Sequence, residues 1–117
     1  MKSLLNLEEA AMFIAAFFGT IYLDYAWWLF FAWLLAPDVS MIGYLFNTKI
    51  GAVFYNLAHH KGVAVACFVA GFVISSPEWM FAGLLLFGHS AMDRVFGYGL
   101  KYADDFKHTH LGWIGKK

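Results

Sequence analysis

Charged residues occupy few positions along the chain and leave long apolar stretches between them. Within residues 10–48 the only charged residues are Asp24 and Asp38, and within residues 62–92 the only one is Glu78. A helix needs about 20 residues to cross a hydrocarbon layer of about 30 Å, so each stretch is long enough for at least one crossing. The pattern predicts four helices joined by short breaks. They cover about residues 7–23, 26–46, 51–75 and 79–100.

These helices predict an all-α fold, a four-helix transmembrane bundle with short loops, in which residues 1–117 form a single domain. Pro37 falls inside the second helix, where it removes a backbone donor and predicts a kink. Residues 102–117 are polar and predict a cytoplasmic tail. Lys61 lies about ten residues into the third helix. It must snorkel, face a water-filled cavity or mark a break, and a re-entrant third segment stays open as an alternative.

Aromatic and basic residues near the breaks predict how the bundle sits in the membrane. Tyrosines and tryptophans gather at the first break and Trp79 follows the third, as is typical of residues at the headgroup level. The lysines gather elsewhere, at the N-terminus, the second break and the tail: Lys2, Lys49, Lys101, Lys107, Lys116 and Lys117. The positive-inside rule therefore places both termini in the cytoplasm. No convincing cleavage site follows the first apolar run, so we expect a retained segment of a multi-pass protein in a bacterial inner membrane.

Composition supports the membrane interpretation and excludes several other classes of protein. Hydrophobic residues make up 62% of the 117 residues and charged residues 14%, against about 45–50% apolar in a typical globular domain. So short a chain has too little interior to bury that much apolar surface. The net charge is zero, which argues against nucleic acid as a partner. The single Cys67 excludes an intrachain disulfide, a CxxC redox pair and a CxxCH haem attachment.

Ionisable residues inside the predicted helices are the candidates for function, because a charge in hydrocarbon is costly unless it is paired or hydrated. Asp38 lies eight residues before the end of its helix (46 − 38), and His59 lies eight residues after the start of its helix (59 − 51). His89 and Asp93 lie eleven and seven residues before the end of the fourth helix, on one face at a spacing of four. At about 1.5 Å per residue, all of them lie about 10–17 Å from the cytoplasmic ends. Three helices thus place carboxylates and imidazoles in one layer.

Two imidazoles and two carboxylates predict a divalent metal, namely zinc, manganese or non-haem iron. The expected ligands are Asp38, His59, His89 and Asp93. The side chains expected to orient these ligands are Tyr55, Asn56, Ser90 and Lys101. A bound metal would support hydrolysis or oxidation of a lipid-soluble or amphipathic substrate. Arg94 or Lys101 would bind an anionic group, and His110 would act as a general acid or base.

Two other interpretations stay open at this point. His59 and His89 are also expected as the axial ligands of a b-type haem in an electron-transfer protein. Alternatively, the chain is a non-catalytic membrane subunit or small transporter, in which Asp38 and Asp93 pair with Arg94 or Lys61 in a buried charge network. Self-association into a homo-oligomer is compatible with each of them.

Several segments resemble a family of small bacterial integral membrane proteins, the domain-of-unknown-function family numbered 4260. They are APDVSMIGYL at residues 36–45, GAVFYNLAH at 51–59, GHSAMDRVFGYGLKY at 88–102 and FKHTHLG at 106–112. The resemblance extends over residues 8–112 and implies a membrane architecture, but it implies no reaction. His60 and His108 depart from the family pattern and are therefore poorer candidates for a shared function. The positions that match the pattern are Pro37, Asp38, Ser40, Tyr44, Tyr55, Asn56, His59, His89, Asp93, Arg94, Lys101, Thr109 and His110.

A looser likeness links the chain to membrane-bound, metal-dependent hydrolases. Those proteins also carry a Pro-Asp motif and a later helix with histidine and aspartate near the membrane face. The likeness concerns the fold only and cannot supply a reaction.

Overall fold

The computed structural model describes residues 2–96, 99–101 and 107–114, which are mostly helical. The helices are α1 (Lys2–Tyr22), α2 (Trp27–Trp33), the 3-10 helix η1 (Ala36–Leu45), α3 (Thr48–His59), α4 (Lys61–Val73) and α5 (Pro77–Val95). A short antiparallel pair, β1 (His108–Thr109) and β2 (Gly112–Trp113), follows them. The predicted tail is therefore folded where it is described. Its residues 102–106 and 115–117 lie outside the described residues.

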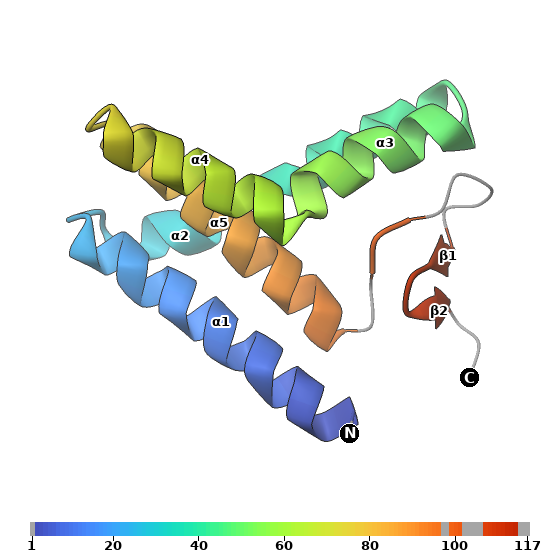
Figure 1. Cartoon of the computed structure of the whole chain (residues 1–117), viewed down its shortest axis with the longest axis horizontal. Helices are drawn as coiled ribbons and strands as arrows, with labels where there is room; N and C mark the ends of the chain where they lie inside the picture. The colour runs from blue at the N-terminus through green and yellow to red at the C-terminus, as the bar shows by residue number, and fades with distance from the viewer. Residues whose placement is uncertain (1, 97–98, 102–106, 115–117) are drawn as a thin grey trace.

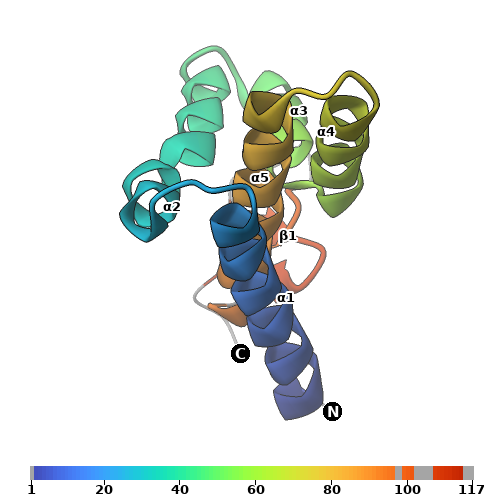
Figure 2. The same cartoon turned by 90° about the vertical axis from the view of Figure 1, so that its left-hand side faces the viewer.

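The helices form two units that meet near the middle of the molecule (Figure 1). In the first unit α5 packs along both α1 and α4, and in the second η1 packs against α3. Few contacts join α3 to α4 or to α5. Seen from the side, α5 occupies the centre of the molecule, with the other helices around it (Figure 2). The outer end of the η1–α3 unit and the N-terminal end of α1 point away from each other, so the two units are close together only near the middle of the molecule (Figure 1).

The second predicted helix is divided at Pro37, as its missing backbone donor leads us to expect. Residues 27–33 are α-helical, and the chain continues as η1 from Ala36. The backbone N–H of Asp38 donates to the carbonyl of Leu35, three residues earlier, at 3.1 Å. An α-helix would have paired that donor with the carbonyl of Leu34. In a 3-10 turn the Leu34 carbonyl would accept from the N–H of residue 37, which proline lacks, so this carbonyl is left for another donor.

The third predicted helix, residues 51–75, is two helices in the structure. His60 adopts an extended conformation with ψ of 122° and ends α3. Its side chain accepts a hydrogen bond from the backbone N–H of Gly62 at 3.0 Å and so caps α4. Lys61 is the first residue of α4 and forms an ion pair with Glu9 of α1. Of the three explanations that the sequence left open for Lys61, a break in the helix is the one observed.

Both turns at the other end of the first unit close in the same way. Asp24 and Ser75 adopt positive φ angles of 67° and 57° after α1 and α4. The following residues, Tyr25 and Ser76, donate backbone hydrogen bonds to the carbonyls five residues earlier, those of Thr20 and Gly71. This is the Schellman arrangement, which satisfies carbonyls that a helix end leaves free. Ser76 then caps α5 through the backbone N–H of Trp79, and Pro77 opens the helix.

Close packing of α4 on α5 depends on glycine. A Cβ atom at Gly83 would lie 2.7 Å from the carbonyl oxygen of Ala64 and 2.7 Å from the backbone nitrogen of Phe68. Neither backbone atom can move without moving its helix, so only glycine permits this approach. A small core of Ala16, Phe30, Leu34 and Leu85 fills the space between α1, α2 and α5.

Two segments of the described chain are long and apolar enough to cross a membrane. They are Ser3–Tyr22 and Trp27–Leu45, and only 11% and 24% of their most apolar windows are buried inside the protein. This finding rests on length and composition. Large apolar side chains are also exposed on the other helices, for example Phe54 on α3, Phe72 on α4 and Trp79 on α5.

Candidate metal centre

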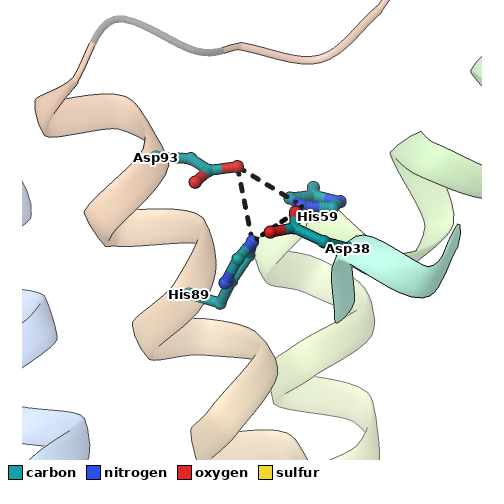
Figure 3. A group of neighbouring side chains, drawn as sticks. All are labelled: Asp38, His59, His89 and Asp93. Atoms are coloured by element: carbon teal, nitrogen blue, oxygen red, sulfur yellow. Dashed lines mark hydrogen bonds and ion pairs between the residues drawn. The ribbon is translucent and has the colours of Figure 1, made fainter. Parts of the chain in front are cut away.

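Four side chains from three helices converge where the two units meet (Figure 3). Asp38 comes from η1, His59 from the last turn of α3, and His89 and Asp93 from successive turns of α5. Asp38 Oδ1 lies 3.3 Å from His59 Nε2 and 3.0 Å from His89 Nε2. Asp93 Oδ2 lies 3.3 Å and 3.5 Å from the same two nitrogens. The four possible ligand atoms all lie within 4.8 Å of one another.

The group is buried on all sides except at Asp38. His59 is 2% exposed and His89 is fully buried. The side chain of Asp93 is 13% exposed, whereas that of Asp38 is 41% exposed. Any small molecule or ion would therefore approach the group past Asp38. The exposed side of the group is therefore the side formed by η1.

Backbone carbonyls fix the orientation of both imidazoles. His59 Nδ1 lies 2.9 Å from the carbonyl oxygen of Tyr55, and His89 Nδ1 lies 2.7 Å from that of Leu34. A carbonyl can only accept, so each Nδ1 carries the proton and donates it. The Leu34 carbonyl is the one that the 3-10 turn at Pro37 leaves free. Pro37 thus fixes the ring of His89 indirectly.

This orientation leaves both Nε2 atoms as acceptors that face carboxylate oxygens. Facing acceptors repel each other unless a positive charge lies between them, either as protons on the imidazoles or as a metal ion. A metal bound at about 2.1 Å by nitrogen and oxygen holds neighbouring ligand atoms about 3.0–3.4 Å apart when the angles between them are 90–110°. The four observed distances are 3.0–3.5 Å. The remaining separations between ligand atoms reach up to 4.8 Å, so the buried Asp/His group could hold a metal ion once these atoms move closer together.

Tyr55 supports two of the four side chains. Its hydroxyl donates to Asp93 Oδ2 at 3.1 Å, and its ring stacks on that of His59 with centroids 3.8 Å apart and an interplanar angle of 6°. The Nζ atom of Lys101 lies 4.7 Å from the centroid of the Tyr55 ring, and Lys101 is only 4% exposed. Burial lowers the pKa of the Lys101 amine, and the negative charge of Asp93 opposes that shift.

The C-terminal end of α3 is held by two hydrogen-bond donors from α5. Ser90 Oγ donates to the carbonyl oxygen of His59 at 2.8 Å, and Arg94 Nη2 lies 3.4 Å from the same oxygen. These contacts satisfy a carbonyl that the end of α3 leaves without a helical partner. They also fix the backbone of one of the four converging residues.

A family model described as "Domain of unknown function (DUF4260)" matches residues 2–114. The chain belongs to the DUF4260 family. No curated protein and no solved structure matches the chain. The four converging residues and the side chains around them all lie within the DUF4260 match. The family description supplies no reaction, so the chemistry of this DUF4260 protein has to be inferred from the site.

The side chains expected to orient the ligands occupy different places in this DUF4260 structure. Tyr55 contacts Asp93 and His59 directly, and Ser90 contacts the backbone of His59. Asn56 instead binds the backbone of Lys101 through both atoms of its amide, as donor to the carbonyl at 2.8 Å and as acceptor from the N–H at 2.6 Å. Arg94, expected to bind an anion, contacts the His59 carbonyl. Asp38 and Asp93 face the imidazoles, whereas Lys61 pairs with Glu9.

Sequence reasoning missed the roles of Leu34 and Glu9. Leu34 contributes its carbonyl to His89 and Glu9 pairs with Lys61. Pro37 was a usable signal for the first, because proline lacks the N–H that would otherwise bind a carbonyl three or four residues earlier. The sequence held no comparable signal for the second.

His110 lies in the C-terminal segment, outside the group of four. The Nδ1 atom of His110 accepts a hydrogen bond from the backbone N–H of Leu100 at 2.9 Å. The backbone N–H of His110 donates to the Leu100 carbonyl at 2.9 Å. A Cβ atom at Gly99 would lie 2.6 Å from His110 Nδ1. A larger residue at position 99 would therefore displace the His110 ring. Burial and the positive charge of Arg94 lower the pKa of His110.

We expect the C-terminal segment to loosen as the pH falls through the lowered pKa of His110. The unfolded chain binds a proton at higher pH than the folded chain does, so the stability contributed by this contact falls from about pH 6.5 downward and is lost below the folded pKa. A protonated Nδ1 can no longer accept from Leu100. Amide hydrogen exchange of residues 99–101 and 107–114 should accelerate between pH 7.5 and pH 5, after correction for intrinsic rates. In His110→Gln the exchange should be fast at both values, and an equal pH response in that variant would contradict the assignment.

Proposed function

We propose that this protein is an integral membrane metalloprotein that holds one divalent cation between Asp38, His59, His89 and Asp93. The observation that carries the proposal is the convergence of two Nε2 atoms and two carboxylate oxygens at 3.0–3.5 Å. With both imidazoles neutral these atoms are all acceptors, and a cation at the centre would convert four repulsive contacts into four favourable ones. The carbonyls that bind both Nδ1 atoms supply the fixed tautomers that metal-binding histidines usually have.

Two nitrogen and two oxygen ligands suit zinc, manganese or non-haem iron. The chemistry we propose is hydrolysis: a metal held by these residues would polarise the substrate and activate a water molecule, which requires one coordination position that no side chain occupies. With iron bound, the same site would support oxidation. Lys101 and Arg94 supply positive charge beside the centre for an anionic group of the substrate. His110 is proposed as a general acid or base from the C-terminal segment.

The proposed substrate is lipid-soluble or amphipathic, because the protein is proposed to lie in the bacterial inner membrane with both termini in the cytoplasm. Support comes from the two apolar segments Ser3–Tyr22 and Trp27–Leu45, whose outer faces are exposed. Non-helical backbone at membrane depth is tolerated only where its polar groups are satisfied inside the protein. The breaks at Leu34 and His59 meet that condition, since both carbonyls accept hydrogen bonds from α5.

The site favours this proposal over a b-type haem. A haem iron with His59 and His89 as axial ligands needs the porphyrin plane to pass between the two imidazoles. Carboxylate oxygens of Asp38 and Asp93 lie within 3.5 Å of both Nε2 atoms and fill that space. The remaining alternative is a network without a metal, in which protonated imidazoles pair with the carboxylates.

Elemental analysis of protein purified without chelator or metal-affinity chromatography tests the proposal. We expect close to one equivalent of zinc, manganese or iron per chain, and its loss from the double variant His89→Ala, Asp93→Ala. The matched control is His60→Ala, which removes an exposed imidazole that caps α4 and lies outside the group. Metal content that is the same in the double variant and the wild type would refute the site. A folded wild type that takes up no added Zn²⁺, Mn²⁺ or Fe²⁺ would leave the protonated network as the explanation.

A further inference from the structure

A second feature lies away from the four converging residues, in the seam between α1, α4 and α5. It is an open groove with a volume of about 200 Å³. Only apolar residues line it: Ala15, Ala16, Ala64, Val65, Phe68, Gly83, Leu84 and Phe87. Small residues on all three helices leave the space free, and two phenylalanines form its walls.

Water is a poor occupant for this groove. An ordered water needs two to four polar partners, and the lining side chains offer none. Leaving the groove empty is also unfavourable, because the lining atoms then lack van der Waals partners. A volume of about 200 Å³ corresponds to about seven groups of about 30 Å³ each, the share of one water molecule in the liquid. A short stretch of alkyl chain has the required size and polarity.

The surroundings of the groove indicate what kind of molecule carries that chain. The helix α1 borders it and is one of the two segments apolar enough to cross a membrane. The ion pair between Glu9 and Lys61 lies in the same seam between α1 and α4, and Lys61 precedes Ala64 by three residues, or about 5 Å along α4. One end of the groove is thus close to paired charges, and the groove itself has no polar side chain. This change from charged to apolar surroundings along the groove matches an amphipathic molecule with a polar head and an apolar tail.

We infer that the groove binds the alkyl chain of a fatty acid, with the polar head toward Glu9 and Lys61. The inference rests on the groove and on the proposed membrane location, and it does not require a metal at Asp38. Of the helices that line the groove, α5 also carries His89 and Asp93 of the candidate centre.

Photo-crosslinking tests the inference. Protein in phosphatidylcholine nanodiscs is irradiated with a trace of a fatty acid that carries a diazirine near the end of its chain, and labelled peptides are identified by mass spectrometry. We expect labels to concentrate on groove residues such as Val65, Phe68 and Phe87. The double variant Ala15→Phe, Val65→Phe fills the groove from two partly exposed walls and should reduce this labelling about tenfold, because it removes most contacts of the chain.

The control variant is Val69→Phe, which adds the same side chain one turn further along α4, at an exposed position outside the groove. Its labelling should equal that of the wild type. Labels spread evenly over the exposed faces of α1 and α4, or unchanged in the filled variant, would overturn the inference. Crosslinks between two protein chains at Val65 would show a second copy in the groove and would also overturn it. The same experiment on His89→Ala, Asp93→Ala should give wild-type labelling, so failure of the metal proposal leaves this test intact.

Discussion

Adding the divalent cation to metal-free protein in mild detergent should raise its Tm by about 10 °C. A ligand that binds only the folded state stabilises it by about 2.7 kcal/mol at a free concentration 100 times the Kd. For a chain of this length, each kcal/mol corresponds to about 4 °C. The stabilisation should extend to the whole molecule, because the ligands come from both units. Asp38 and His59 belong to the η1–α3 unit, and His89 and Asp93 belong to α5.

Few other contacts join the two units. A cation at the centre would therefore connect two groups of helices that otherwise meet mainly through Ser90, Arg94 and the Tyr55–Asp93 hydrogen bond. Without the cation, the carboxylates and imidazoles can only reduce their repulsion by taking up protons. We expect the metal-free protein to unfold in two steps, with the η1–α3 unit separating first. The metal-bound protein should unfold in one.

Differential scanning fluorimetry with EDTA, followed by back-titration with Zn²⁺, measures this effect. The variant His89→Gln keeps a polar side chain of similar size but cannot act as an imidazole ligand, and it should show no change in Tm on addition of metal. The variant His60→Gln should respond as the wild type does. An equal response of wild type and His89→Gln would mean that the stabilising metal binds elsewhere.

Much of this site was predictable from the depth of polar residues in apolar segments. Asp38, His59, His89 and Asp93 share one layer because each lies at a similar distance from the end of its predicted helix, and the structure brings all of them together. The predicted family is confirmed by the match over residues 2–114.

Other features were not predictable, because they depend on contacts between distant residues. The periodicity of residues 51–75 continues through His60, and the break there is stabilised by a histidine cap on one side and by donors from α5 on the other. Histidine is not a typical capping residue, so the sequence carried only the charge of Lys61 as a sign. The partner of Asn56 was missed for the same reason. Lys101 lies 45 residues away, and an asparagine inside an apolar helix more readily suggests a role at the site itself.

Replacing Asn56 with leucine should release the C-terminal segment from the site. The Asn56 amide forms two hydrogen bonds with the backbone of Lys101, a residue that is 4% exposed. Leucine fills similar space but can neither donate nor accept, so a buried N–H and a buried carbonyl would lose their partners. Each such loss costs about 1–3 kcal/mol. We expect a total loss of about 2–4 kcal/mol, because local detachment of the segment lets water form some of the lost hydrogen bonds.

The effect should spread along the segment through its own contacts. Lys101 pairs with Thr109 as an isolated bridge, and Leu100 exchanges two hydrogen bonds with His110. Amide exchange at Leu100, Lys101 and His110 should accelerate by about 30-fold or more, since each 1.4 kcal/mol corresponds to a factor of ten. In Asn56→Asp the backbone N–H of Lys101 keeps its acceptor while its carbonyl loses a donor, so we expect an intermediate rate. The control Asn47→Ala removes an exposed cap of α3 and should leave these amides unchanged.

Release of this segment also bears on the chemistry, because it carries the Lys101 amine away from the Tyr55 ring and from the charge of Asp93. The part of the site that Lys101 covers, at Tyr55, would then open to solvent. A bound metal should therefore leave Asn56→Leu faster than the wild type when EDTA is added, even though Asn56 contacts none of the four candidate ligands. Equal metal-release rates together with accelerated amide exchange would mean that the segment covers the site without controlling access to it. Unchanged amide exchange would show that Asn56 does not hold the segment.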